Sequence, residues 1–392
     1  MRAILFNNVQ FIYELILAQR ELKSFGVEFK IDETLRNFLL PEIHPEILQV
    51  LSKRLAYFEK IGEEYTAYYY LVRKNRTKSP NQYLTHWIYP YKGKFHPQMV
   101  RALLNIMGLK ENDTVLDPFI GSGTTAIEAL LLGINCIGID ISPLCAIQSK
   151  VKTQSFESIN EILEYKTIVF ETIEDKGSKV IEKITEIKNE NVKNFYLLAY
   201  LVAVSDNIRR DRDFKKSFLE NTEKMILSIK DFKTVLEQLS LKPGKVTIME
   251  GDARNLPLVT ESVDGIITSP PYSVALDYVS NDAHSLKALG YELEKMREKF
   301  IGVRGQGTKR LELYNEDMMV VLKELYRVLK PQKFAVIILG NATHKGKEIK
   351  TVEFVIKQAE ATGFMLVENI EKIIFGLYNF INKENILVFQ KI

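Results

Sequence analysis

Cysteine is scarce in this chain, because its 392 residues include only Cys136 and Cys145. Two cysteines cannot form a disulfide framework or a four-ligand zinc site, so a reducing cytoplasm is the expected compartment. Long apolar runs are also missing, since no stretch approaches the roughly 20 residues that span a bilayer. Residues 1–8 contain no secretory apolar segment. We therefore expect a cytoplasmic protein with no membrane partner.

Clustered metal ligands are absent as well. The five histidines, at positions 44, 86, 96, 284 and 344, are scattered along the chain. A metal site needs several ligands that converge on one point, and neither the histidines nor the two cysteines form such a group. The sequence therefore predicts no metal.

Acidic residues are missing from one long segment, although the net charge of the whole chain is only +3. Residues 65–110 contain no Asp or Glu but carry many basic and aromatic side chains. Basic groups neutralise phosphates and aromatic rings stack on bases, which predicts a nucleic-acid-binding strip. A solvated basic face with structural aromatics is the alternative. The residues are Arg73, Lys74, Arg76, Lys78, Lys92, Lys94, Arg101 and Lys110, with Tyr83, Trp87, Tyr89, Tyr91 and Phe95 among them.

The most informative segment is residues 114–125, which read Thr-Val-Leu-Asp-Pro-Phe-Ile-Gly-Ser-Gly-Thr-Thr. A short apolar run enters a glycine-rich turn, and the spacing of apolar residues at 126–131 predicts a helix. Residues 136–140 predict a second strand, which ends on Asp140. This order is the first half of a nucleotide-binding βαβ unit. The turn lacks both the G-x-G-x-x-G spacing and a P-loop lysine, but alone it leaves a dinucleotide site open.

Two carboxylates follow these strands. Asp117 ends the first strand, where it suits a positively charged group such as the amino group of a methionine moiety. Asp140 is placed to accept hydrogen bonds from ribose hydroxyls, with a helix N-cap role as the alternative because Ser142-Pro143 follows.

A second motif, Ser269-Pro270-Pro271-Tyr272, follows the predicted strand at 263–267. The proline pair fixes the backbone and removes two N–H donors, so carbonyl oxygens are left to accept. A serine hydroxyl and a rigid carbonyl suit an amine that donates, and Tyr272 offers a stacking face for a base. A plain proline-rich loop is the alternative.

Strands and helices alternate again from residue 245 to the C-terminus, which predicts an α/β fold. We expect an open, mostly parallel sheet covered on both faces, whose last two strands form an antiparallel edge. The further strands are expected at 245–249, 334–339, 364–374 and 386–390, and helices at 318–329 and 352–361. The expected organisation is a mainly helical appendage (1–90), the first half of a cofactor domain (91–151), a helical insert suited to substrate recognition (152–243) and the second half with the Pro-Pro-Tyr motif (244–392).

Together these motifs resemble the S-adenosylmethionine-dependent amino-methyltransferases of DNA and RNA, the cytosine-N4 and adenine-N6 class. Residues 117–125 match the family's cofactor motif, and residues 269–272 match its catalytic motif. Lys94-Phe95-His96-Pro97 resembles an upstream cofactor element, Asp140 the ribose-binding acid, and Gly251-Asp252 the adenine-edge motif. The resemblance covers residues from about 90 to 280 and implies a Rossmann-like methyltransferase fold with a seven-stranded sheet. It implies that S-adenosyl-L-methionine is bound by Lys94, His96, Asp117, Phe119, Gly121, Gly123, Thr124, Asp140, Asp252 and Ala253, and that Ser269, Pro270, Pro271 and Tyr272 are catalytic.

The serine in the catalytic motif is typical of the family's cytosine-N4 enzymes. We therefore expect site-specific DNA methylation by direct transfer to a flipped base. The cofactor motif precedes the catalytic motif, and no Ser/Thr-rich target-recognition segment is evident. This leaves open a tRNA or rRNA methyltransferase acting on cytidine N4 or guanosine N2. The pattern is also compatible with adenine-N6 methylation of DNA and with a non-catalytic nucleic-acid-binding protein.

One further basic segment, residues 299–310, contains three glycines and no acid. Glycines give mobility and basic side chains contact phosphates, so the segment is expected either to close over a nucleotide or to be an ordinary surface connection.

Overall fold

The computed structural model describes residues 1–77, 79–173, 178–272, 276–344, 347–373 and 383–392. Lys78 of the predicted basic strip and Ile374 of a predicted strand lie outside these ranges. No helix among the described residues has the length and hydropathy needed to cross a bilayer. The same residues hold no group of three or more His, Cys, Asp or Glu side chains suited to a metal ion.

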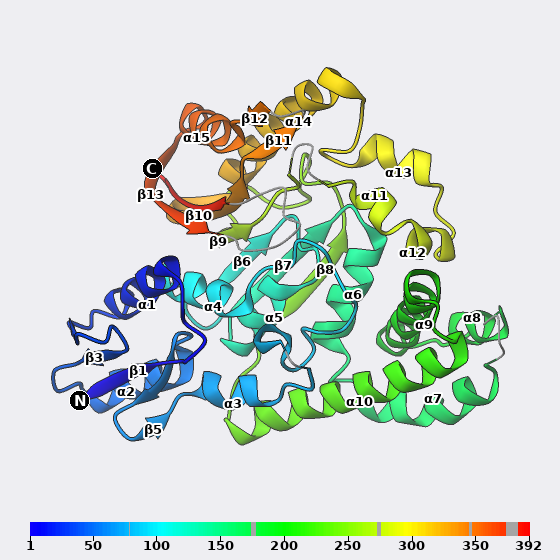
Figure 1. Cartoon of the computed structure of the whole chain (residues 1–392), viewed down its shortest axis with the longest axis horizontal. Helices are drawn as coiled ribbons and strands as arrows, with labels where there is room; N and C mark the ends of the chain where they lie inside the picture. Colours follow the sequence, from blue (N-terminus) through cyan, green and yellow to red (C-terminus); the bar gives the residue numbers. More distant parts are fainter. Residues whose placement is uncertain (78, 174–177, 273–275, 345–346, 374–382) are drawn as a thin grey trace.

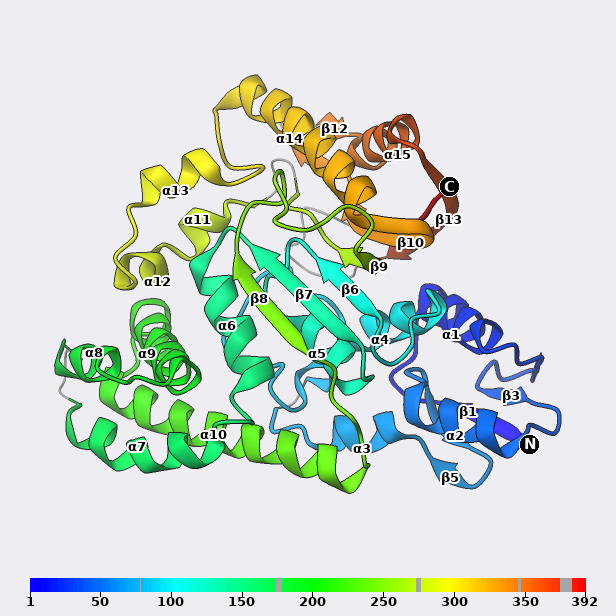
Figure 2. The ribbon, with the colours of Figure 1, turned by 180° about the vertical axis from the view of Figure 1, so that it is seen from behind.

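A seven-stranded sheet forms the centre of the molecule (Figures 1 and 2). Its strand order is β13-β14-β10-β9-β6-β7-β8. The five strands from β10 to β8 are parallel, whereas β14 is antiparallel to both of its neighbours. The predicted mostly parallel, Rossmann-like sheet with an antiparallel C-terminal edge is confirmed. The strands are β6 (Thr114–Asp117), β7 (Asn135–Asp140), β8 (Val246–Glu250), β9 (Val263–Thr268), β10 (Leu329–Gly340), β13 (Phe364–Ile373) and β14 (Lys383–Lys391).

Helices cover both faces of this sheet. Two successive side chains of β6 show this, because each is buried in a different hydrophobic core. Val115 of β6 belongs to a core shared with α4 and α5, whereas Leu116 belongs to the core under α14 and α15. Side chains alternate between the faces of a sheet, so a strand buried on both sides is apolar at consecutive positions. The covering helices are α4 (Pro97–Ile106), α5 (Thr124–Leu131) and α6 (Pro143–Gln154) on one face, and α14 (Gly307–Val328) and α15 (Thr351–Thr362) on the other.

The N-terminal appendage combines helices with a small sheet that the sequence did not predict. It contains an antiparallel sheet of five short strands in the order β2-β3-β1-β4-β5. These strands have only two to four residues, too few for a clear alternating pattern in the sequence. The elements are β1 (Arg2–Leu5), α1 (Ile12–Ser24), β2 (Lys30–Ile31), β3 (Asn37–Leu39), α2 (Pro45–Arg54), β4 (Phe58–Ile61), β5 (Glu64–Tyr65), α3 (Ala67–Arg73) and the short 3-10 helix η1 (Pro80–Gln82).

The appendage shares one hydrophobic core with the central sheet. Phe38 and Phe58 of the appendage lie in the same buried cluster as Leu103 of α4 and Ile127 of α5. One hydrophobic core therefore extends across the predicted boundary at residue 90.

The insert between β7 and β8 is helical, with its own core. Its helices are α7 (Ile159–Glu171), α8 (Ser178–Thr185), α9 (Glu190–Arg210) and α10 (Phe214–Gln238). Phe195 and Phe218 are fully buried in a cluster that also includes Leu286 of α12. The insert therefore packs against the segment that follows the Pro-Pro-Tyr motif. That segment contains α11 (Tyr278–Asn281), α12 (Ala283–Ala288) and α13 (Leu293–Lys299), and the hairpin β11 (Ala342–His344) and β12 (Lys347–Ile349) follows α14 and β10.

Candidate active site

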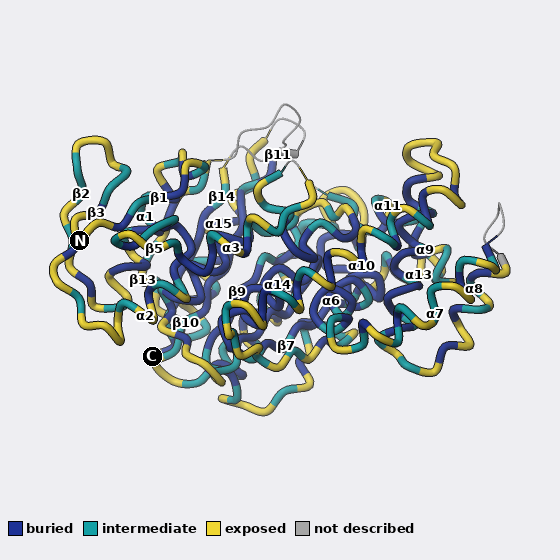
Figure 3. The backbone as a smooth tube through the Cα atoms, turned by 90° about the horizontal axis from the view of Figure 1, so that it is seen from below, coloured by how far each residue is buried: buried dark blue, intermediate teal, exposed yellow. Residues whose placement is uncertain are grey.

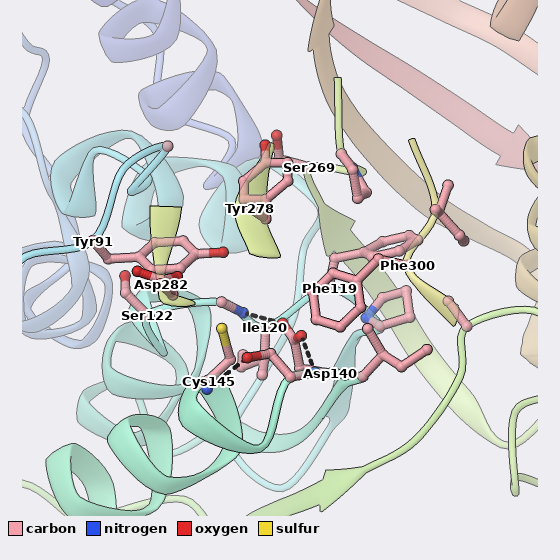
Figure 4. Close-up of a pocket in the computed structure, with 18 of the residues that line it drawn as sticks. Tyr91, Phe119, Ile120, Ser122, Asp140, Cys145, Ser269, Tyr278, Asp282 and Phe300 are labelled. Carbon is pink, nitrogen blue, oxygen red and sulfur yellow. Dashed lines mark hydrogen bonds between the residues drawn. The ribbon is translucent and has the colours of Figure 1, made fainter. Parts of the chain in front are cut away.

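A cleft opens where β6, β7 and β9 end (Figure 4). Its volume is about 970 Å³ including the open mouth. Ligands of open α/β sheets bind at the carboxyl ends of the strands, and this cleft occupies that position. The structure brings most of the predicted site residues together here. Those that line the cleft are Lys94, Phe119, Gly121, Thr124, Asp140, Asp252, Ala253, Ser269, Pro271 and Tyr272.

The glycine-rich turn between β6 and α5 is shaped by two left-handed residues. Gly121 has φ +50° and lines the cleft, where an added Cβ would lie 3.1 Å from the Tyr91 ring. Gly123 has φ +81° and lies outside the cleft lining, at the start of α5. A Cβ there would lie 3.1 Å from the Cα of Ser149 in α6. Gly121 thus keeps the cleft open, whereas Gly123 allows α5 and α6 to pack closely.

Asp140 is held at the floor of the cleft by backbone amides. Its Oδ2 accepts a hydrogen bond from Gly121 N (2.9 Å) and its Oδ1 accepts one from Ser142 N (2.9 Å). Burial raises the pKa of this carboxyl to about 6. The N-cap of α6 is Ser142. The capping role that was the alternative for Asp140 is therefore not what the structure shows.

Asp117 lies behind the turn, apart from the residues that line the cleft. Its carboxylate accepts hydrogen bonds from the hydroxyls of Thr125 (2.7 Å) and Thr268 (2.8 Å) and from Phe119 N (3.2 Å). Burial raises its pKa to about 7. Asp117 therefore joins the glycine-rich turn to the end of β9 and supports the cleft from outside.

In the upstream element, residues 94–97, one predicted cofactor residue lines the cleft and the other lies outside the lining. The Lys94 ammonium lines the cleft and donates to the carbonyls of Asn81 (3.2 Å) and His86 (2.6 Å). Burial lowers the pKa of Lys94 to about 7 and that of His96 to about 3. His96 occupies the N-cap position of α4 and is not part of the described lining, so it supports the element as a neutral ring.

Asp252 is fixed in the cleft wall by an arginine that the sequence did not single out. Arg254 donates to both oxygens of the Asp252 carboxylate (2.6 to 3.1 Å). It also donates to Asp317 of α14 (3.0 Å) and to the carbonyl of Lys299 (2.9 Å). These hydrogen bonds raise the pKa of Arg254. Arg254 thereby connects Asp252 to the segment that carries Phe300 and Ile301, which also line the cleft.

The Pro-Pro-Tyr motif lies directly after the carboxyl end of β9. Ser269, Pro271 and Tyr272 line the cleft, whereas Pro270 is buried beside it. The Tyr272 hydroxyl donates to Glu384 at the start of β14 (2.5 Å), and Glu384 pairs with Lys372 of β13 (2.6 Å). The antiparallel edge of the sheet therefore fixes the orientation of the tyrosine ring.

Several lining residues carried no motif that could have revealed them. Figure 4 shows Phe300 beside the predicted Phe119 on one side of the cleft, with Tyr91 and Asp282 on the opposite side. Tyr278 and Asp282 come from α11 and its junction with α12. Burial raises the pKa of Asp282 to about 6. In the sequence, only the proximity of Tyr278 and Asp282 to residue 272 connected these two residues with the site.

The described residues of the predicted basic and aromatic strip are divided between the interior and the surface. Tyr83 and Tyr89 are buried, and the Arg101 guanidinium is fully buried against the carbonyls of Lys53 and Arg54. Arg76 is paired with Asp231 of α10 (2.6 Å). The basic side chains of Arg73, Arg76, Lys92 and Lys110 are exposed, so part of the strip's positive charge remains at the surface.

The basic segment 299–310 is used structurally, as an ordinary surface connection would be. Arg304 donates to both oxygens of Asp317 (2.8 and 2.6 Å). Arg310 donates to the carbonyls of Gly302 (2.6 Å) and Leu276 (3.2 Å), and α14 already begins at Gly307. The two arginines of the segment are thus hydrogen-bonded within the protein, whereas Lys299 and Lys309 are exposed.

Comparison with known proteins finds relatives among nucleic-acid methyltransferases. Residues 36–150 match the N6/N4 methyltransferase family, described as DNA methylase. The Type II methyltransferase M.BsoBI of Geobacillus stearothermophilus is 30% identical over 315 residues, which cover 64% of this chain and 60% of the relative. M.MjaII of Methanocaldococcus jannaschii is 32% identical over 183 residues (43% and 32%). A tRNA (guanine(10)-N2)-dimethyltransferase of the same archaeon is 31% identical over 100 residues (25% and 28%).

The matched regions thus span 60% or less of the length of these relatives. The fold and the cleft define a Rossmann-like α/β protein with a cleft at the carboxyl ends of its central strands. The chain is related to the N6/N4 amino-methyltransferases, and the resemblance inferred from its motifs is confirmed.

Proposed function

We propose that this protein is an S-adenosylmethionine-dependent methyltransferase that acts on the exocyclic amine of a base in nucleic acid, with cytosine N4 in DNA as the target. The observation that carries the proposal is one cleft that holds both motifs. Asp140 and Gly121 form its floor, and Ser269 and Tyr272 form its mouth. Relatives named as Type II methyltransferases and the DNA methylase family support DNA as the substrate.

The lining residues fit S-adenosyl-L-methionine. Two carboxylates, Asp140 and Asp252, accept hydrogen bonds from hydroxyl and amino groups, and Phe119 offers an aromatic face. Gly121 provides space where a side chain would meet the Tyr91 ring. When bound, this group supplies a methyl carbon attached to a positively charged sulfur.

In the proposed reaction the amine nitrogen forms a bond to the methyl carbon while the carbon–sulfur bond breaks. The bonding electron pair goes to sulfur, and the amine releases one proton to solvent. Ser269 accepts a hydrogen bond from the amine, and Tyr272 stacks on the flipped base. Positioning alone can lower such a barrier by roughly 7 to 11 kcal/mol. No nucleophilic cysteine is needed, and burial raises the pKa of Cys145, which keeps this cleft thiol protonated.

The choice of cytosine N4 as the target is based on the serine at position 269, which is typical of that branch of the family. A second candidate, methylation of an RNA base, is favoured by the similarity to a tRNA dimethyltransferase. Adenine N6 remains the alternative within DNA.

The test is transfer of labelled methyl groups to genomic DNA and to total RNA by the wild type and two variants. We expect Ser269→Ala and Tyr272→Ala to bind the cofactor normally and to lose at least tenfold in transfer rate. Tyr70→Ala, an exposed tyrosine on α3, is the matched control and should transfer normally. Wild-type rates in both site variants would contradict the assignment of the catalytic motif, and transfer to RNA alone would favour the second candidate.

A further inference from the structure

The turn between α9 and α10 forms an exposed, basic projection, which we call the insert tip (residues 207–216). Figure 3 shows it as an exposed end beyond α9. All of its residues except Phe214 are exposed. The tip carries five basic and two acidic residues, and Ile208 beside them is 64% exposed.

The insert tip is connected to the rim of the cleft. The Arg209 guanidinium donates to the carbonyl of Asn281 at the end of α11. It also lies 3.7 Å from Asp282, which lines the cleft. The next residues of the tip therefore extend outward from the rim of the site.

One buried carboxylate holds two guanidinium groups of the tip in place. Asp206 pairs with Arg210 (2.6 Å) and with Arg212 (3.3 Å), and it also accepts a hydrogen bond from Ser217 (2.8 Å). The side chains of Arg210 and Arg212 stay 51% and 59% exposed although they are paired. A single carboxylate neutralises only one of them, so positive charge remains at the surface.

Two lysines follow on the first turn of α10. Lys215 and Lys216 are exposed, and their ammonium groups form no hydrogen bond or ion pair with any residue that the structure describes. Asp213 uses its carboxylate to cap α10 through Lys216 N (2.7 Å). The lysine charges are therefore free to meet an anion in solvent.

We infer that the insert tip binds the phosphate backbone of the DNA whose base enters the cleft. This inference rests on the proposed function. Cations that are held outward beside a catalytic cleft neutralise phosphates and fix the register of the duplex, but they carry no sequence information themselves. The exposed Ile208 adds an apolar surface that suits a deoxyribose.

The inference is tested with Lys215→Glu/Lys216→Glu. The matched control is Lys230→Glu/Lys233→Glu, two exposed lysines near the other end of the same helix, close to the pair of Arg76 with Asp231. Fluorescence anisotropy measures binding of a labelled mixed-sequence DNA duplex and, separately, of labelled tRNA, over a range of salt concentrations. Cofactor affinity and methyl transfer are measured for the same proteins.

We expect the tip variant to bind DNA at least tenfold more weakly than the control. The slope of log K against log salt should fall by roughly two, because each lost phosphate contact removes about 0.9. Cofactor affinity should stay unchanged. DNA binding and salt slope equal to the control would overturn the inference while leaving wild-type methyl transfer, and hence the proposed function, intact. A loss of affinity for tRNA alone would overturn DNA as the occupant, and a wild type that binds neither nucleic acid would overturn both proposals.

Discussion

Replacing Asp140 by Asn tests the floor of the cleft with the smallest change of shape. The carboxylate accepts two backbone hydrogen bonds at 2.9 Å, one on each oxygen. An amide has only one acceptor oxygen, so either Gly121 N or Ser142 N would face an NH₂ group. A buried donor without a partner costs about 1 to 3 kcal/mol, which we expect as lost stability of the folded protein.

The same substitution removes the negative charge that cofactor hydroxyls would meet. A hydrogen bond to a charged group contributes about 1.5 to 3 kcal/mol. Because 1.4 kcal/mol corresponds to a factor of ten, Asp140→Asn should weaken S-adenosylmethionine binding by about tenfold to a hundredfold.

The pH dependence provides a second test of the same residue. The pKa of Asp140 is raised to about 6, so its protonated form is favoured by folding. Its contribution to stability is present below the ordinary value near 3.9 and is lost as pH rises through 6. Cofactor affinity should change in the opposite direction, because the carboxylate is the acceptor, and should fall as pH drops below 6. Asp140→Asn should lack this component of the pH profile.

Isothermal titration calorimetry with S-adenosylmethionine between pH 5 and 8 measures both effects. Asp113→Asn is the control, because Asp113 accepts a backbone hydrogen bond from Lys110 N (2.8 Å) at an exposed position. A Kd within about threefold of the control and an unchanged pH profile would refute the role of Asp140.

Two further substitutions address the glycine-rich turn and the Pro-Pro-Tyr motif. Gly123→Ala should lower the free energy of unfolding by more than the roughly 1 to 3 kcal/mol of its left-handed backbone, because the new Cβ meets Ser149. Gly26→Ala, with φ +72° and open space, should show the backbone cost alone in thermal melts, and equal losses would contradict the packing argument. Tyr272→Phe removes the hydrogen bond to the Glu384 carboxylate and should lower kcat by about tenfold to a hundredfold, with cofactor affinity unchanged. A kcat equal to that of the wild type would show that this anchor is dispensable.

The sequence predicted those parts of the site that are encoded locally. The strand, the glycine-rich turn and the helix within residues 114–131 are determined by residues that are neighbours in the sequence. The same is true of the positions of Asp140 and the Pro-Pro-Tyr motif at the ends of their strands. Their periodicity and turn chemistry could be interpreted without a partner. The central sheet followed from the alternation of such units.

Contacts between distant segments could not be predicted in this way. Tyr272 and Glu384 are 112 residues apart, and Arg254 and Asp317 are 63 apart. For the same reason, charge along the chain does not reveal that Arg101 of the basic strip is buried against backbone carbonyls. The strands of the appendage form antiparallel pairs with one another. Each strand is too short to show an alternating pattern of apolar and polar residues in the sequence.

The most direct test of the central claim is the identity of the methylated nucleoside. Purified protein would be incubated with methyl-labelled S-adenosylmethionine and, in parallel, with genomic DNA, total tRNA and rRNA, and the digested nucleosides would be separated by mass spectrometry. We predict labelled N4-methylcytosine in the DNA sample. N6-methyladenine would contradict the assignment from Ser269, and a cofactor-binding protein that labels none of the three pools would contradict the proposed activity.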